Sequence, residues 1–301
     1  MNKDVRGGVT ARCSDVPAPS RLVLSTFSGA GLLDRGFSRE GFCVTSAGDA
    51  QFGQPIQEFN AVPGVWAGVI GGPPCQRFST ANRTTRDASA GLELIAEFFR
   101  VVGQALPDFF VLENVNGLPD VSALVPLGYS LQRLHLNPRD LGFAQHRPRW
   151  FLFGFARGEP LVIPYVTPRS RDDAGVSRCA MASEGRRAGK REWADFCELQ
   201  GLPRTFDFPK GLSTALRYRL VGNGVHVGVA SIVARAILER PQGNLTLKTP
   251  PTRRLCVCEC GREVPASRIH ATVSCRKRME RRRDATSPKV RGPVTGELAL
   301  A

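Results

Sequence analysis

The sequence predicts an α/β fold in which helices cover a doubly wound, mostly parallel sheet. Short apolar runs typical of buried strands recur through the first half of the 301-residue chain. Helix-like stretches of about 10 to 15 residues separate several of these runs, and this alternation builds parallel sheets. With 42% hydrophobic residues, the chain can bury a large core.

The first strand is expected at 21–26 (RLVLST), and a glycine turn joins it to a helix over 31–40. Four more strands and one more helix follow, the strands over 42–49, 64–70, 108–115 and 149–156 and the helix over 91–105. From about 156 to 190 the chain is rich in Arg, Ser, Gly and Asp and predicts an irregular insert, whereas 191–240 regains helical character.

The charge of the chain is +14 and is unevenly distributed. Residues 253–291 hold twelve Lys or Arg against four Asp or Glu, a net +8. A segment of this kind favours nucleic acid phosphates, and the alternative is a solvated, disordered tail. The sequence shows neither a signal peptide nor a run of about 18 apolar residues. We therefore expect a cytoplasmic protein without membrane contact, whose nine cysteines are thiols or metal ligands.

Two features of the first half could bind a nucleotide-like ligand. The FSGAG turn places Gly29 and Gly31 between a strand and a helix, where the backbone can approach a ligand closely. Asp49 ends the next strand and could accept both hydroxyls of a ribose. The alternatives are an ordinary tight turn and a helix N-cap.

Three further sites carry reactive or charged side chains. Cys75 follows Pro73-Pro74 on a stiffened loop, and the alternative is an inert buried thiol. Glu113 ends an apolar strand, so its carboxylate must be paired, exposed in a cleft or used. In 145–149 (QHRPR) an extended backbone would point Gln145 and both arginines to one face, with a surface salt bridge as the alternative.

In their order and spacing these segments resemble the cytosine-5 DNA methyltransferase family, from about Leu22 to Ala230. The matching motifs are FSGAG (27–31), GGPPCQRFS (71–79), ENV (113–115), QxRxR (145–149), LQGLPRTF (199–206) and VGNGV (221–225). The resemblance implies a Rossmann-like methyltransferase fold. It also implies transfer of a methyl group from S-adenosylmethionine to C5 of a cytosine flipped out of a short DNA sequence.

The resemblance implies a role for each catalytic candidate. Cys75 would add to C6 of the base as a nucleophile, and Glu113 would hydrogen-bond N3 and the exocyclic amine. Arg147 would contact O2, with Arg149 supporting it or the DNA backbone. The base that removes the C5 proton is not assigned. The implied cofactor-binding residues are Phe27, Ser28, Gly29, Gly31, Asp49, Pro74, Asn223 and Val225.

The resemblance and the composition together divide the chain into segments. We expect a flexible lead-in (1–19), a catalytic and cofactor-binding domain (20–155), a small target-recognition region (156–212), a return helix completing the catalytic domain (213–240), a linker (241–254), a zinc and basic DNA-binding module (255–284) and a disordered tail (285–301).

Some positions depart from the family pattern. Leu32 stands where a second glycine is usual, and Gly224 and His226 replace a small residue and a proline. Pro55 stands in place of the aspartate that contacts the adenine amine, which predicts weaker cofactor binding.

The tail lies outside the resemblance. It contains Cys258, Cys260, His270 and Cys275, enough ligands for a closed structural zinc site. Cys256 with Cys260 is an alternative pair, and a reduced, disordered tail is the alternative to any metal. The basic run after Cys275 is expected to be a helix on DNA phosphates.

Double-stranded DNA is the expected partner, with a cognate restriction endonuclease and a monomeric enzyme as further expectations. Two other functions stay open from the sequence. One is the same chemistry on a structured RNA such as tRNA, and the other is a catalytically silent DNA-binding homologue.

Overall fold

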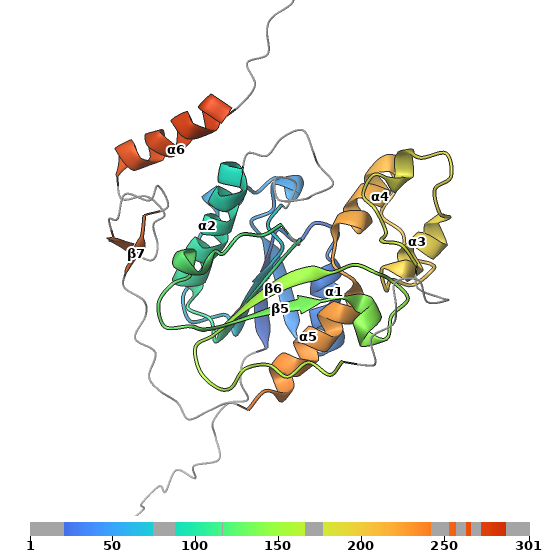
Figure 1. Cartoon of the computed structure of the whole chain (residues 1–301), viewed down its shortest axis with the longest axis horizontal. Coiled ribbons are helices and arrows are strands. Elements are labelled where there is room, and N and C mark those ends of the chain that lie inside the picture. Colours follow the sequence, from blue (N-terminus) through green and yellow to red (C-terminus); the bar gives the residue numbers. More distant parts are fainter. Residues whose placement is uncertain are drawn as a thin grey trace, which may run out of the picture.

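A six-stranded sheet in the order β2-β1-β3-β4-β6-β5 forms the centre of the computed structural model (Figure 1). Its strands are β1 (Leu22–Thr26), β2 (Cys43–Ala47), β3 (Gly68–Gly71), β4 (Phe109–Asn114), β5 (Ser130–Leu136) and β6 (Arg149–Phe155). The structure describes residues 21–74, 88–115, 117–165, 177–241, 253–256, 263–265 and 272–286.

The sheet is parallel from β2 to β4, and only β6 runs antiparallel to its neighbours β4 and β5. This confirms the predicted mostly parallel sheet. All five expected strands exist. The third is shorter than expected, because Gly64 takes a left-handed backbone (φ 74°) and Val65 is exposed, so the chain is still turning there.

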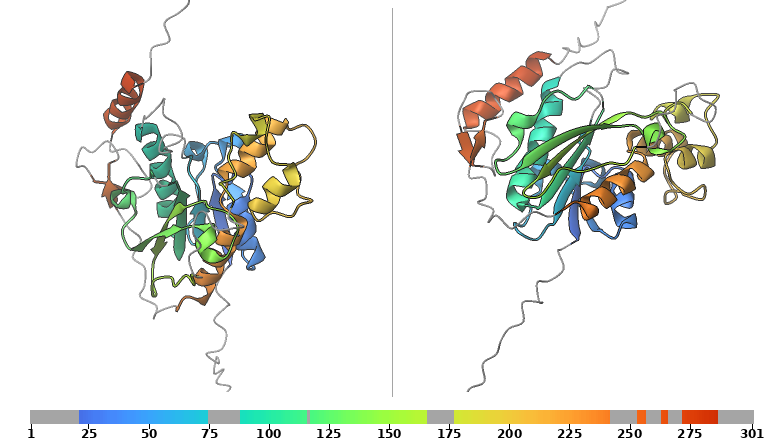
Figure 2. Two further views of the ribbon diagram at one scale, coloured as in Figure 1. Left: turned by 45° about the vertical axis from the view of Figure 1, so that its right-hand side comes forward. Right: turned by 60° about the horizontal axis from the view of Figure 1, so that its bottom comes forward.

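Helices cover both faces of the sheet (Figure 2). Along β1, Val23 faces α1 (Leu32–Arg39) and α5 (Val227–Glu239), whereas Leu24 faces α2 (Ala88–Ala105). Successive residues of this strand therefore enter opposite cores, which favours apolar side chains at adjacent positions.

The contact between α1 and α5 is unusually close. A Cβ atom built on Gly36 would lie 2.2 Å from the Cβ of Ala230, and Ser231 Oγ donates to the Gly36 carbonyl at 3.3 Å. Small residues on both helices let the two backbones approach. The first and last helices of the sheet domain thus form one layer.

A smaller group of elements lies to one side of the sheet, where Figure 1 shows α3 (Trp193–Leu199) and α4 (Thr214–Asn223). Trp193 packs against Phe196 and Tyr218 and joins the two helices. The predicted return helix over 213–240 is two helices, because the chain is extended at Gly224 and His226.

By length and composition alone, the segment Thr214–Glu239 could cross a membrane. Of its apolar 18-residue window, 61% is buried within the fold, and the segment is interrupted between α4 and α5, as is typical of core helices.

The described part of the tail consists of β7 (Arg253–Leu255), β8 (Glu263–Pro265) and α6 (Val273–Thr286). The two short strands pair antiparallel, and α6 lies beside α2 (Figures 1 and 2). The expected helix after the last cysteine is confirmed, although it begins two residues before Cys275.

Candidate active site

A pocket opens where the carboxyl ends of β1, β3 and β4 meet the glycine turn before α1, the usual ligand position in such sheets. Of the expected cofactor residues, seven line it: Phe27, Ser28, Gly29, Asp49, Pro74, Asn223 and Val225. Gly31 does not. It lies directly behind the pocket as the N-cap of α1, with a left-handed φ of 70°.

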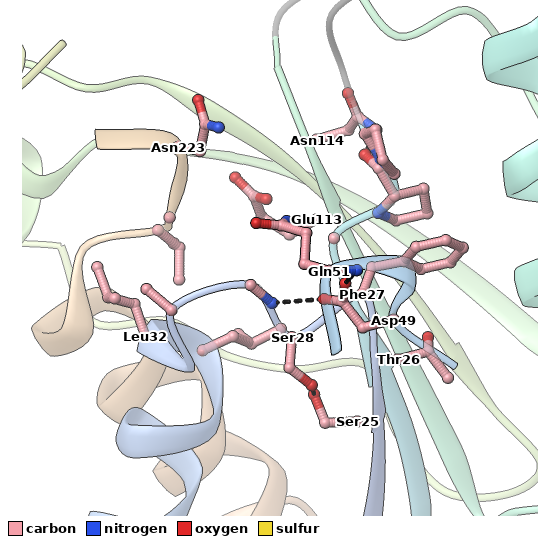
Figure 3. A pocket seen from close by; sticks show the side chains of 18 of the residues that line it. Ser25, Thr26, Phe27, Ser28, Leu32, Asp49, Gln51, Glu113, Asn114 and Asn223 are labelled. Atoms are coloured by element: carbon pink, nitrogen blue, oxygen red, sulfur yellow. Dashed lines mark hydrogen bonds between the residues drawn. The ribbon is translucent and has the colours of Figure 1, made fainter. Parts of the chain in front are cut away.

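Asp49 holds the glycine turn in place. Its Oδ2 accepts a hydrogen bond from the Gly29 N–H at 2.8 Å, and its Oδ1 accepts from the Gln51 N–H at 2.8 Å (Figure 3). It is therefore a helix N-cap, the alternative considered from the sequence, and it lines the pocket as well. Each carboxylate oxygen keeps a second lone pair for a ligand hydroxyl.

Phe27 has a backbone conformation that is uncommon for a large side chain. Its φ is 54°, and Gly29 two residues later has the same value. A Cβ on Gly29 would meet no atom within 4 Å, so this position opens onto free space rather than packed protein. Strain of this kind gathers at ligand sites, since the surrounding fold must enforce it.

Glu113 and Arg149 form a buried ion pair in the pocket, with the guanidinium Nε 3.2 Å from the carboxylate Oε1. Burial raises the pKa of Glu113, and the nearby Arg149 and Arg147 offset this only in part. Oε1 makes no hydrogen bond among the described residues although it is buried. A buried acceptor without a donor is costly, which suits a ligand that brings donors.

Asn114 fixes the loop that leads to the expected nucleophile. Its Nδ2 donates to the Pro73 carbonyl at 3.2 Å, and Pro74 lines the pocket. A Cβ on Gly72 would lie 3.2 Å from Glu113 Oε2, so glycine leaves room for the carboxylate. Cys75 is the next residue after Pro74 and lies outside the described residues.

Arg147 does not line the pocket, in contrast to the expectation that it contacts the base. It is 2% exposed, and its guanidinium donates to protein atoms on other elements. Gln145 and Arg147 do share a face, because the Ala180 N–H donates to Gln145 Oε1 at 3.2 Å and Arg147 donates to the Ala180 carbonyl. Arg149, the first residue of β6, instead pairs with Glu113. Burial lowers the pKa of Arg147 to about 10, so it remains charged near neutral pH.

Two departures from the family pattern contact one another. A Cβ on Gly224 would lie 2.9 Å from Leu32 Cδ2, so the leucine occupies space that the glycine leaves open. Both residues line the pocket. The third departure, His226, caps α5 by accepting from the Gly228 N–H at 3.1 Å, and burial lowers the pKa of His226 to about 3.

The wall formed by 50–58 contains residues that the sequence did not single out. Pro55 is outside the pocket, but Gln51, Ile56 and Gln57 line it. Arg100 of α2 holds this wall by donating to the Ile56 carbonyl at 2.7 Å. The only sequence signal that could have predicted Gln51 and Gln57 as lining residues is that they are polar and follow closely after Asp49.

Of the expected zinc ligands, Cys258, Cys260 and His270 lie outside the described residues. Cys275 lies in the first turn of α6 and is buried, as is Cys256 after β7. Within the part of the chain that the structure describes, no group of three or more metal-ligating side chains occurs.

The pocket fits an adenosyl-methionine ligand by its donor and acceptor set. It offers a carboxylate at one strand end, a glycine turn with open space beside Gly29 and amide side chains on the wall that follows. The Glu113–Arg149 pair lines the same cavity. Its carboxylate can accept from a donor of a second, planar ligand, and its guanidinium can donate to an acceptor of that ligand.

Comparison with known proteins agrees with this geometry. Residues 54–174 match the family model of the C-5 cytosine-specific DNA methylases. The Type II methyltransferase M.MthTI of Methanothermobacter thermautotrophicus is 30% identical over 176 residues, 50% of this chain and 53% of that protein. M.AquIA of Picosynechococcus sp. is 38% identical over 118 residues, 33% of this chain and 47% of that protein. The chain thus spans about half the length of these relatives.

Solved structures share the fold. The Entamoeba histolytica methyltransferase EhMeth superimposes with a TM-score of 0.55 at 12% identity, covering 74% of this chain and 99% of that one. S. pombe Dnmt2 methyltransferase gives a TM-score of 0.51 at 15% identity, covering 72% of this chain and 98% of that one.

Proposed function

Because residues 54–174 match the family model of the C-5 cytosine-specific DNA methylases, we propose that the chain methylates C5 of cytosine in DNA. The observation that carries the proposal is the buried Glu113–Arg149 pair with an unsatisfied carboxylate oxygen, on the pocket wall that leads to Cys75. The site supplies charge and hydrogen-bonding groups for a base on the same side of the sheet as a cofactor pocket.

Cys75 is proposed as the nucleophile. Its sulfur forms a bond to C6 of the cytosine, the C5–C6 double bond opens, and the electron pair moves onto the ring. When bound, S-adenosylmethionine would supply an electrophilic methyl group. C5 takes this methyl as its bond to the sulfonium sulfur breaks, and S-adenosylhomocysteine is the leaving group. Loss of the C5 proton to an unassigned base then restores the double bond, and the carbon–sulfur bond breaks. The Asn114 contact to the Pro73 carbonyl supports this role, since it fixes the backbone two residues before the thiol.

Glu113 is proposed to protonate and hold N3, and its second oxygen accepts from the exocyclic amine. The raised pKa of Glu113 suits a carboxyl group that must carry a proton near neutral pH. Arg149 keeps the carboxyl in place and is the guanidinium that we assign to O2 of the base, the contact first expected of Arg147.

S-adenosylmethionine is the proposed cofactor. Asp49 would hold the ribose, Phe27 would stack near the adenine, and the Gly29 turn would leave room for the methionine part. Asn223 and Val225 would complete the pocket. Gln51 and Gln57 offer amide groups to the adenine amine in place of the acid that Pro55 replaces.

The partner is proposed to be double-stranded DNA. The duplex must open to expose the base, at a cost of about a few kcal/mol, which phosphate contacts can offset. Among the α6 side chains that the structure describes, four basic ones are exposed: Arg276, Lys277, Arg278 and Arg281. We propose that they bind phosphates and that residues 156–212 read the target sequence. A structural zinc in the tail, a monomeric state, a cognate restriction endonuclease and a cytoplasmic location complete the proposal.

The test is transfer of labelled methyl from S-adenosylmethionine to unmethylated DNA by the wild type and by Cys75→Ala, with bisulfite sequencing of the product. We expect transfer by the wild type alone, in one short recurrent context. A parallel reaction with tRNA separates the RNA alternative. Absence of transfer to either substrate by a folded protein would favour a silent DNA-binding homologue.

A further inference from the structure

The buried cation Arg147 has no carboxylate partner within ion-pair distance among the residues that the structure describes. Its guanidinium instead donates to backbone carbonyls on two distant segments. Nη2 donates to Gly222 at 2.7 Å and to Gly224 at 2.8 Å, and Nη1 donates to Ala180 at 2.8 Å. Nη1 also lies 2.8 Å from Cys179 Sγ.

The carbonyls of Gly222 and Gly224 belong to the C-terminal end of α4. The last carbonyls of a helix lack partners within the helix and carry its partial negative charge. Arg147 therefore satisfies orphan acceptors and places its positive charge against the negative end of the helix. This explains how a guanidinium can be fully buried without a carboxylate in ion-pair contact.

A second side chain acts on the same helix end. Gln200 Nε2 donates to the Val221 carbonyl at 2.7 Å and to the Gly224 carbonyl at 3.2 Å. Gln145 donates to Gln200 Oε1 at 3.1 Å and aligns its amide. Side chains from outside α4 thus hold the carbonyls of residues 221, 222 and 224.

The residues held in this way form one wall of the pocket. Asn223, Gly224 and Val225 line it, and Figure 3 shows Asn223 well apart from Asp49 in the same cavity. Any displacement of the end of α4 would therefore change the width of the pocket. No lining atom comes from Arg147 itself. It acts on this wall through these carbonyls, and its charge also acts on Glu113 of the same pocket.

We propose that Arg147 is a positioning residue that sets the affinity for S-adenosylmethionine by fixing the Asn223–Val225 wall against the rest of the pocket. The proposal rests on the proposed function, since it concerns the cofactor of that reaction. The same guanidinium donates to the Ala180 carbonyl. It therefore also holds Ala180, near the start of the stretch that begins at residue 177 in the proposed recognition region, against the Asn223–Val225 wall.

The experiment compares Arg147→Lys with the matched control Arg240→Lys in the full-length chain. Arg240 is also buried and donates to two carbonyls, of Arg157 at 2.7 Å and Glu159 at 2.9 Å, but it does not line the pocket. A lysine cannot reach several carbonyls at once, so both variants lose comparable hydrogen bonds. Thermal unfolding measures stability, and titration calorimetry measures the Kd for S-adenosylmethionine and S-adenosylhomocysteine.

We expect both variants to melt at lower temperature, whereas only Arg147→Lys weakens cofactor binding, by roughly 10- to 100-fold. In the methyl-transfer assay its KM for the cofactor should rise more than its kcat falls. Gln200→Met removes two hydrogen bonds to the same helix end without changing the charge. If Arg147→Lys does not fold, the cofactor affinity of Gln200→Met tests the proposal instead.

Wild-type cofactor affinity in a folded Arg147→Lys or Gln200→Met variant would overturn the proposal. An equal loss of affinity in Arg240→Lys would do so too, because the effect would then be general destabilisation. If the wild type itself bound no cofactor, the proposed function would fail together with the inference.

Discussion

Replacing Glu113 by Gln separates the chemical role of this residue from its structural one. The change keeps the size of the side chain and removes its charge. A unit charge pair at the observed 3.2 Å attracts by about 5 kcal/mol at an effective dielectric constant of about 20. The pKa of Glu113 is nevertheless raised, so the cost of burying the carboxylate exceeds the attraction of both arginines.

The sign of the effect on stability follows from this pKa. With a folded-state value above the unfolded 4.5, the folded protein binds the proton first as pH falls. The carboxylate therefore destabilises the fold at neutral pH, and the wild type gains stability as pH falls through the raised pKa. At neutral pH the unfolding temperature of Glu113→Gln should equal or exceed that of the wild type. The difference between the two unfolding temperatures should shrink as the pH is lowered.

Activity should respond in the opposite direction. A glutamine can hydrogen-bond the base but cannot transfer a proton to N3. We expect the rate of methyl transfer to fall by roughly 10²- to 10⁴-fold, equal to about 3 to 5 kcal/mol of barrier. For the wild type, the rate should decline as pH rises through the raised pKa of Glu113.

The assay is single-turnover methyl transfer at saturating cofactor, with thermal unfolding of the same samples. Glu184→Gln is the control for stability, because Glu184 is a buried carboxylate that accepts from Arg191 at 2.7 and 2.8 Å. It should melt at lower temperature. Retention of more than about a tenth of the rate by Glu113→Gln would refute the proton-transfer role.

Three further predictions test other parts of the molecule. Asp49→Ala leaves two backbone N–H groups without their acceptor, which costs about 1 to 3 kcal/mol for each group that is buried. We expect calorimetry to show S-adenosylmethionine binding weakened by at least about tenfold. Unchanged affinity would contradict the place of Asp49 in the site. Gly36→Ala forces a Cβ to within 2.2 Å of the Ala230 side chain, so urea unfolding should show a loss of about 1 to 3 kcal/mol in the free energy of unfolding. Gly189→Ala is the control, because a Cβ there would meet no atom within 4 Å and should leave the stability unchanged. Replacing the four exposed cations of α6 by Gln should lower the slope of log Kd for DNA against log salt by up to about 3.6; an unchanged slope would exclude α6 from the interface.

The sequence carried enough information for the centre of the sheet, because the buried strands β3 and β4 are largely apolar and few other segments share that composition. It did not predict β5. This edge strand is largely exposed and mixes polar with apolar residues, so its composition does not distinguish it from a loop.

The site was predictable where function depends on residues close together in sequence, as in the Gly29 turn and the ENV triplet. Arg147 was misplaced because its partners, Ala180 and Gly222, are 33 and 75 positions away along the chain. Nothing in the local pattern distinguishes an arginine that faces a ligand from one that faces a helix end. Gln57 was missed for a related reason, since the short turn over Ile56–Glu58 brings it to the pocket only in the folded chain.

The layer shared by α1 and α5 also affects the order in which the protein can fold during synthesis. Gly36 and Ser231 are 195 positions apart, so the side of α1 that contacts α5 has no partner until nearly the whole sheet domain has left the ribosome. Contacts of such large sequence separation slow folding, because a long loop must close before they form. A nascent chain truncated before α5 would leave the side of α1 around Gly36 uncovered.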